Sequence, residues 1–136
     1  MKQDWYKPLA WAMWLFLPGT ALNYWRAWDQ LPMRMAVHFN ASSQPNGWTS
    51  REGAVMVGLG IMAVLLVLFT VGALIVRALQ PSASWPMLIG FYIVLGFLWY
   101  SNNAIVTWNL RAHDAAQRSE LVVPRIPPRS NGSVVG

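Results

Sequence analysis

The feature that most constrains this chain is the stretch of residues 53–76, which is apolar, contains no charged residue and is closed by Arg77. A helix needs about 20 apolar residues to cross the hydrocarbon core of a bilayer. Only a helix or a closed barrel can cross, because a backbone amide without a partner is costly in hydrocarbon. We therefore predict a transmembrane helix at residues 53–76.

Two further stretches have the length and composition of membrane spans, at residues 8–25 and 85–110. Pro8 suits a first helical position, and Pro18 with Gly19 predicts a kink in the first span. The connector at residues 78–84 is short, so its two helices should be antiparallel neighbours. The predicted fold class is an all-α membrane protein, with three transmembrane helices in one domain, residues 1–110, and a short structured loop at residues 26–52.

The start of the chain also fits a cleaved signal peptide, because Lys2 and Lys7 precede a short apolar run. We expect an uncleaved helix instead. At the other end, residues 111–136 are polar and contain prolines, and we expect a flexible tail there. A Pro-rich docking ligand for another protein is the alternative interpretation of this tail.

The composition supports a lipid environment. Only 11% of the residues are charged, whereas soluble domains contain about a quarter. The net charge of +5 does not indicate nucleic-acid binding, because the basic residues are scattered singly and suit anionic lipid headgroups better. The chain has no Cys, which excludes disulfides and thiolate metal sites. Aromatic residues lie near the predicted span ends, as in membrane-interface belts: Trp5, Tyr6, Tyr24, Trp25, Trp28, Trp48, Trp85 and Trp108.

The loop at residues 26–52 shows two local patterns. Apolar and polar residues alternate from residue 33 to residue 39, which predicts a short strand with one apolar face. The run from Ser42 to Gly47 predicts a tight turn, because Pro45 presets φ and Asn46-Gly47 tolerates positive φ. Thr49 or Ser50 would then cap the next helix.

The order of residues in this loop resembles a bacterial membrane family of unknown function. The matching residues are Leu31-Pro32, His38-Phe39-Asn40, and Pro45-Asn46-Gly47-Trp48 followed by Ser50-Arg51, directly before a long apolar helix. The family loop reads roughly L-P-x-x-x-x-x-H-F-x-x-x-G-x-P-D-G-W-x-S-K/R. The resemblance covers about residues 9 to 76.

The same module is similar to the N-terminal half of SdpI-type immunity proteins, which protect Bacillus from a toxic secreted peptide and can hold a transcriptional repressor at the membrane. The resemblance therefore implies a bacterial inner-membrane protein with an immunity or sensing role. This chain has Ser43 where the family has Gly, and Asn46 where it usually has Asp. It also has three predicted spans, without the further membrane half of SdpI.

The candidate residues for binding a ligand or partner are His38, Phe39, Asn40, Asn46, Trp48 and Arg51 in the loop, with Asn102 and Asn109 on the third predicted helix. His38 could tie the loop to its own backbone, contact a ligand or bind a metal. Its neighbouring donors, Asp29, Asn40 and Glu52, have no diagnostic metal spacing, so we predict neither a metal nor a cofactor.

Asn102 and Asn109 are seven residues apart and share a helix face. Asn23 should lie near the same end of the bundle. These residues could line a polar pocket roofed by the His38 loop, or they could form hydrogen bonds that hold the helices together. Ala54 and Gly58 form a small-x-x-x-small pair, which indicates a close helix contact within the bundle or between two copies.

The sequence contains no paired carboxylates within a span, no nucleophile beside a base and no phosphate-binding glycine loop, so we do not expect an enzyme. We expect a multi-pass protein of the bacterial cytoplasmic membrane that binds a peptide, a lipid or a partner protein. The alternative is a structural accessory subunit of a larger membrane complex. Homo-oligomers are also left open.

The charge distribution and the resemblance predict opposite orientations. The first loop and the C-terminal segment are predicted on the same side of the membrane, and together they carry seven of the ten Lys and Arg residues. This distribution favours a cytoplasmic loop. An immunity module against a secreted peptide would expose that loop outside, and this is the orientation we favour.

Overall fold

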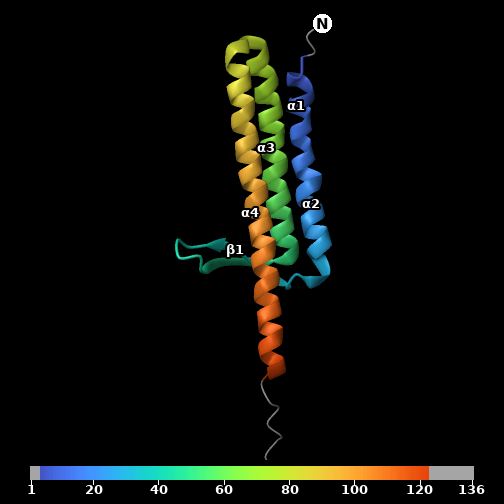
Figure 1. Ribbon diagram of the computed structural model, residues 1–136, viewed down its shortest axis with the longest axis vertical. Helices are drawn as coiled ribbons and strands as arrows, with labels where there is room; N and C mark the ends of the chain where they lie inside the picture. The colour runs from blue at the N-terminus through green and yellow to red at the C-terminus, as the bar shows by residue number, and fades with distance from the viewer. Residues whose placement is uncertain (1–3, 123–136) are drawn as a thin grey trace, which may run out of the picture.

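The computed structural model describes residues 4–122, which form a long helical bundle with a small hairpin at its side (Figure 1). The elements, in chain order, are α1 (Tyr6–Ala12), the 3-10 turn η1 (Met13–Leu15), α2 (Phe16–Ala27), the 3-10 turn η2 (Trp28–Gln30), β1 (Arg34–Phe39), β2 (Pro45–Ser50), α3 (Arg51–Leu79) and α4 (Pro81–Val122).

The first helical segment, α1 to α2, packs against both α3 and α4. Two apolar clusters form the core. One lies toward the N-terminus and includes Met13, Met62 and Leu95, and the other lies beside the hairpin and includes Leu31, Met35 and Val106. Hydrogen bonds from aromatic side chains also join the first segment to α3, since the Tyr6 hydroxyl donates to the Ala73 carbonyl at 2.8 Å.

Two helices, α3 and α4, are long and apolar enough to cross a membrane, and the N-terminal helical segment lies beside them. Only 22% and 17% of their most apolar windows are buried within the protein. A core helix of a soluble domain would bury most of such a window. This exposed apolar surface suits lipid better than water.

The N-terminal segment is interrupted earlier than the sequence predicted. The irregular turn η1 covers Met13–Leu15, while α2 continues through Pro18 and Gly19. The reason is that proline disturbs the turn preceding it, because its ring crowds the carbonyl four residues back and it has no N–H to donate. The structure therefore shows a 3-10 turn about one turn before Pro18, where the sequence predicted a kink at Pro18 and Gly19.

The turn between α3 and α4 is shorter than the predicted connector of residues 78–84. Only Gln80 separates the two helices, and its backbone N–H donates to the Val76 carbonyl at 2.8 Å. Pro81 is the first residue of α4, where its missing N–H costs nothing. The two long helices are antiparallel neighbours, as predicted.

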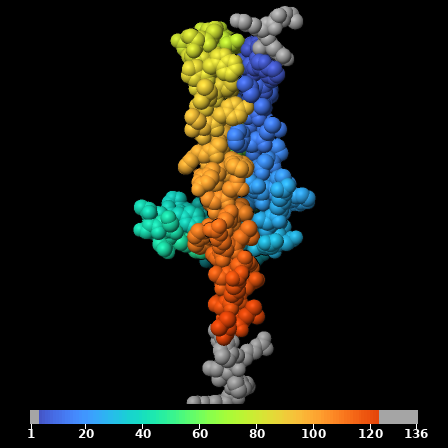
Figure 2. Space-filling view, in the orientation of Figure 1, coloured from blue at the N-terminus to red at the C-terminus, as the bar shows by residue number. Residues whose placement is uncertain are grey.

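The polar segment after residue 110 is helical, which corrects the prediction of a flexible tail starting at 111. The helix α4 continues to Val122 and projects beyond the ends of α2 and α3 (Figures 1 and 2). A contact between residues four apart supports it, with His113 Nε2 and Gln117 Nε2 3.1 Å from each other. The proline-containing part of the predicted tail, residues 123–136, lies outside the described residues.

The predicted strand in the first loop is confirmed as β1, which pairs with β2 in an antiparallel hairpin. The predicted turn within residues 42–47 lies nearer the N-terminus than its Pro-Asn-Gly sequence indicated, because residues 45–47 belong to β2. The chain reverses at residues 40–44 instead. There the Asn40 side-chain oxygen accepts the backbone N–H groups of Ser42 at 3.0 Å and Gln44 at 2.9 Å, and Ser43 adopts a left-handed φ of 58°.

Candidate ligand-binding site beneath the hairpin

The hairpin is fixed to the bundle by the side chain of Asn109, which is 1% exposed. Asn109 Oδ1 accepts the backbone N–H of Ala36 at 2.9 Å, and Nδ2 donates to the Ala36 carbonyl at 2.8 Å. The amide thus pairs with β1 as a neighbouring strand would. Ala36 is fully buried, so both of its backbone groups depend on this side chain.

A second polar contact joins α2, α3 and α4 just below the hairpin. The Tyr24 hydroxyl donates to Asn102 Oδ1 at 2.8 Å. Gly58 of α3 faces this bond, and a Cβ there would clash with Asn102 Oδ1 and lie 3.0 Å from the Tyr24 oxygen. The small-x-x-x-small pair therefore makes a close contact within the bundle. Both asparagines act mainly as the hydrogen-bonding residues that the sequence offered as the simpler interpretation.

Arg51 joins the hairpin end of α3 to η2. Its Nη1 donates to the Trp28 carbonyl at 3.0 Å, and its guanidinium lies 4.1 Å from the centre of the Trp28 ring. Its backbone N–H donates to the Met33 carbonyl at 3.0 Å. Arg51 is therefore occupied in holding the loop. The neighbouring Ser50 caps α3 by accepting the Gly53 N–H at 3.0 Å, as predicted.

His38 and Asn46 face one another across the hairpin, with 2.5 Å between His38 Nδ1 and Asn46 Oδ1. Both residues are exposed. Gly47 makes this approach possible, because a Cβ at that position would lie 2.7 Å from the His38 Cβ. The imidazole Nε2 has no hydrogen bond to the part of the chain that the structure describes, so it can meet a ligand.

An aromatic cluster closes the hairpin against α4. Trp108 makes edge contacts with Phe39 and Trp48, with ring centres 5.2 and 6.3 Å apart. The guanidinium of Arg34 lies 5.8 Å from the Trp48 ring centre. Trp48 remains 46% exposed, so this cluster can pack against a further molecule.

Two hollows lie beneath β1, one on each side of the same ridge of α4. The first, here called the groove, has a volume of about 840 Å³ and is lined by Val37, His38, Phe39, Ser43, Phe97, Tyr100, Ser101, Ala104, Ile105 and Trp108. The second, here called the slit, measures about 310 Å³ and lies between α3 and α4. Both volumes fall within the range of small-molecule sites. They share Val37, His38, Ser101 and Ile105.

The predicted site residues therefore separate into three groups. His38 and Phe39 line the groove and Trp48 adjoins it, whereas Asn102 lines the slit. Asn46 lines neither hollow, but its side chain contacts His38, which lines both. Asn40, Arg51 and Asn109 are engaged in the loop and its anchoring.

Several residues of the hollows were absent from the predicted site: Tyr24, Ser43, Thr49, Phe97, Tyr100, Ser101, Ala104 and Trp108. Two sequence signals could have included some of them. Ser101 precedes the Asn102-Asn103 pair in an apolar span, and Trp108 precedes Asn109. Asn23, predicted at this end of the bundle, has a buried Nδ2 without a hydrogen-bond partner among residues 4–122.

The opposite end of the bundle is held by Asp4. Its carboxylate accepts the Tyr6 backbone N–H at 3.1 Å and pairs with the Arg77 guanidinium, also at 3.1 Å. The Tyr6 N–H and, next, Arg77 hold the pKa of Asp4 below its usual value. Because Arg77 also lies 5.1 Å from the Tyr6 ring centre, this contact ties the start of α1 to the end of α3.

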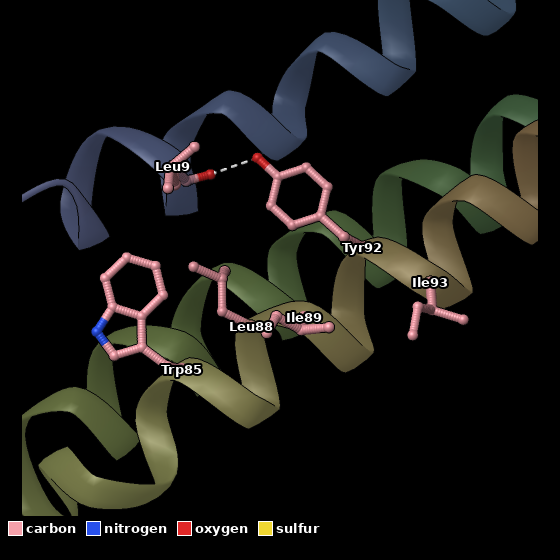
Figure 3. A pocket seen from close by; sticks show the side chains of 6 residues that line it. All are labelled: Leu9, Trp85, Leu88, Ile89, Tyr92 and Ile93. Carbon is pink, nitrogen blue, oxygen red and sulfur yellow. Dashed lines mark hydrogen bonds between the residues drawn. The ribbon is translucent and has the colours of Figure 1, made fainter.

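A third hollow of about 390 Å³ lies at that end, between α1 and α4 (Figure 3). Leu88, Ile89 and Ile93 give it an apolar wall. The Tyr92 hydroxyl donates to the Leu9 carbonyl at 2.7 Å and is therefore already used. This hollow offers a ligand fewer polar groups than the hollows beneath the hairpin.

The part of the chain from residue 4 to residue 122 contains no group of three or more His, Cys, Asp or Glu side chains that could hold a metal. The polar groups in the groove are an imidazole and hydroxyls, set among aromatic rings. Such a set can bind a ligand through apolar burial and a few hydrogen bonds.

Comparison with known proteins gives one match. Residues 9–63 match the model of a family described as a domain of unknown function, DUF1648. The match begins in α1, includes the hairpin and ends within α3, so it does not extend to α4. No curated protein and no solved structure matches this chain.

Proposed function

We propose that this chain is a three-span protein of the bacterial cytoplasmic membrane that binds an amphipathic partner beneath its hairpin without catalysing a reaction. The partner is a peptide, a lipid or a segment of another membrane protein. By its resemblance to SdpI-type proteins, the role would be immunity or sensing. The observation that carries this proposal is the groove, which places His38 and four aromatic side chains, Phe39, Phe97, Tyr100 and Trp108, around one hollow.

The positions of the tryptophans support three spans. Trp5 and Trp25 are 57% and 76% exposed and lie at the two ends of the N-terminal segment. They are separated by about 30 Å at 1.5 Å per helical residue, which matches the thickness of the hydrocarbon core. Trp85 and Trp108 on α4 are about 35 Å apart by the same measure. Aromatic rings at these two levels suit the headgroup regions of a bilayer.

The position of the hairpin also supports binding at a membrane surface. The hairpin projects to the side of the bundle (Figures 1 and 2), and its Phe39 and Trp48 contact Trp108, one of the two α4 tryptophans at the predicted membrane interfaces. Its β1 strand covers the groove, whose other wall reaches Phe97, about 16 Å along α4 from Trp108. An amphipathic partner could therefore meet His38 at the interface and Phe97 in the hydrocarbon.

The experiment is purification of the tagged protein from its own membrane in a mild detergent, followed by mass spectrometry of what remains bound. Wild type should retain one specific partner. His38→Ala and Ala104→Trp, which alter the roof and wall of the groove, should lose it. Val71→Trp is the control, because Val71 is 50% exposed on α3 and lines none of these hollows. Equal recovery of the partner with all four proteins would refute the proposal.

A second candidate function is a structural accessory subunit of a larger membrane complex. The observation that favours it is the end of α4, which extends beyond the bundle with Leu121 and Val122 86% and 80% exposed. A subunit would copurify with a stoichiometric complex that survives His38→Ala and is lost when residues 112–122 are replaced by a flexible linker. The same purification therefore distinguishes the two functions.

A further inference from the structure

We propose that the slit between α3 and α4 holds one acyl chain of a bound phospholipid, with the phosphate of that lipid at the His38 end. This inference rests on the proposed function only in requiring that α3 and α4 cross a membrane. It does not depend on what occupies the groove.

The walls of the slit change from polar to apolar in one direction. Near the hairpin the slit is lined by His38 and Thr49, Ser101 lies in its middle part, and its far end is formed by Ile61 and Leu98. Along α3 the slit covers residues 54–61, a length of about 10 Å. A phospholipid in the adjoining leaflet has the same order of polarity, with its headgroup at the interface and its chains toward the membrane centre.

The slit opens sideways onto the surface that faces lipid. Val57 and Ile61, at its margin, are 59% and 48% exposed. The exposed apolar surface continues along α3 through Val64 and Val71. A chain from the surrounding bilayer can therefore enter from the side. Ala54, with only a methyl side chain, leaves room at the hairpin end of the slit.

The charges near the mouth suit a phosphate. No Asp or Glu is among the residues that line the slit in the described part of the chain. Arg34 lies on the same strand as His38 and is exposed, and its guanidinium is not paired with an acid in residues 4–122. An arginine on the same strand as the imidazole, about 13 Å along it at the membrane interface, favours an anionic or zwitterionic phospholipid over an uncharged one.

The hydrogen bonds within the slit explain why an apolar chain is the better occupant. Asn102 and Tyr24 line it, but they bond to one another at 2.8 Å, and Ser101 Oγ donates to the Phe97 carbonyl at 2.9 Å. Polar groups that are already paired leave the interior of the slit without free donors. A polar ligand would lose its hydration there without compensation.

The test is native mass spectrometry of the full chain, purified in mild detergent and incubated with phosphatidylglycerol, and separately with a diacylglycerol of the same chains. Wild type should retain one phosphatidylglycerol. Val57→Trp should weaken its binding at least about tenfold, equivalent to about 1.4 kcal/mol. Val71→Trp, which changes the same kind of residue about four helical turns away on α3, should bind as wild type does. The diacylglycerol should bind more weakly than phosphatidylglycerol to wild type.

Equal phospholipid retention by wild type and Val57→Trp would overturn the proposal. A second measurement covers the case in which the Val57 variant misfolds. A phosphatidylglycerol with a photoreactive group at the end of one chain should label wild-type residues around Ile61 and Leu98. Labelling spread evenly along α3, including Val64 and Val71, would also overturn it.

The two proposals fail separately in these experiments. Val57→Trp alters the slit alone, whereas Ala104→Trp alters the groove alone. If Ala104→Trp loses the copurifying partner while its phosphatidylglycerol retention is unchanged, the groove proposal is supported. The slit proposal is then decided by Val57→Trp. Loss of phosphatidylglycerol with Val57→Trp while the partner is retained would establish the slit independently.

Discussion

Replacing Asn109 by leucine should detach the hairpin from the bundle. Leucine has a similar size but cannot pair with Ala36, whose backbone N–H and carbonyl would both be left buried without partners. Each unsatisfied backbone group costs about 1–3 kcal/mol. The leucine side chain recovers part of this loss by apolar burial, which is worth about 1.5–3 kcal/mol for a fully buried side chain. We expect a net loss of about 2 kcal/mol.

This loss exceeds the average for a hydrogen bond between transmembrane helices, which is about 0.6 kcal/mol. The difference arises because helices unfolded within a membrane find other partners, whereas Ala36 lies in a strand whose other edge is already paired with β2. The measurement is equilibrium unfolding in mixed micelles with increasing SDS, followed by tryptophan fluorescence. Hydrogen exchange at the Ala36 amide gives a local readout, and its rate should rise strongly in the variant.

Asn103→Leu is the matched control. Asn103 lies on the same helix, but its Nδ2 donates only to the Trp99 carbonyl of α4 itself, at 3.2 Å. Removing that bond should change stability by less than about 0.5 kcal/mol. If Asn109→Leu and Asn103→Leu have the same effect, or if exchange at Ala36 is unchanged, then the amide of Asn109 does not hold the hairpin.

Three further changes test other contacts. Gly58→Ala should destabilise the bundle by about 1–3 kcal/mol in the same unfolding assay, because its Cβ crowds the hydrogen bond between α2 and α4. Gly60→Ala has nothing within 4 Å and should be neutral or slightly stabilising, so equal effects would contradict the close contact. Ser43→Gly should raise the hairpin's stability by about 0.5 kcal/mol, since relief of a left-handed serine, about 1–2 kcal/mol, exceeds glycine's entropic penalty of about 0.5–1 kcal/mol. Slower hairpin amide exchange would confirm this, and faster exchange would contradict it. The lowered pKa of Asp4 means that its contact with Arg77 stabilises the fold above the ordinary value of 3.8 and is lost as the pH falls below it. An NMR titration of the Asp4 carboxylate should show this lowered pKa in wild type and a smaller lowering in Arg77→Ala, where the Tyr6 N–H still donates to the carboxylate. An equal pKa in both proteins would refute the contact with Arg77.

The helices were predictable because their signal is local. Residues 53–76 lie within α3, and residues 85–110 lie within α4, so composition alone located both. The extension of α4 to Val122 was missed because its residues are polar, and polarity was taken to indicate a tail. A helix that begins in an apolar span can continue into a polar segment, since propagation costs much less than nucleation.

The hairpin was only partly predictable. The alternation in residues 33–39 located β1. Its partner β2 begins at Pro45, which resembles a turn residue but can also start an edge strand. The actual reversal depends on the Asn40 side chain, and on a left-handed φ at Ser43 that a non-glycine residue rarely adopts. Two sequence signals pointed there: the turn-forming run that begins at Ser42, and the glycine that the resembled family has at the position of Ser43.

The asparagines show why polarity in a span does not by itself locate a binding site. Their partners, Tyr24 for Asn102 and Ala36 for Asn109, are 78 and 73 residues away in sequence, so no local pattern reveals whether an amide is already paired. A side chain can recognise a ligand only with donors or acceptors that the fold has not used. Asn109 has used both amide atoms, whereas His38 keeps Nε2 at the edge of two hollows. The site is therefore expected at the hairpin's free imidazole and in the apolar walls beneath it, and substitutions of the two asparagines should change binding only by moving or loosening that hairpin.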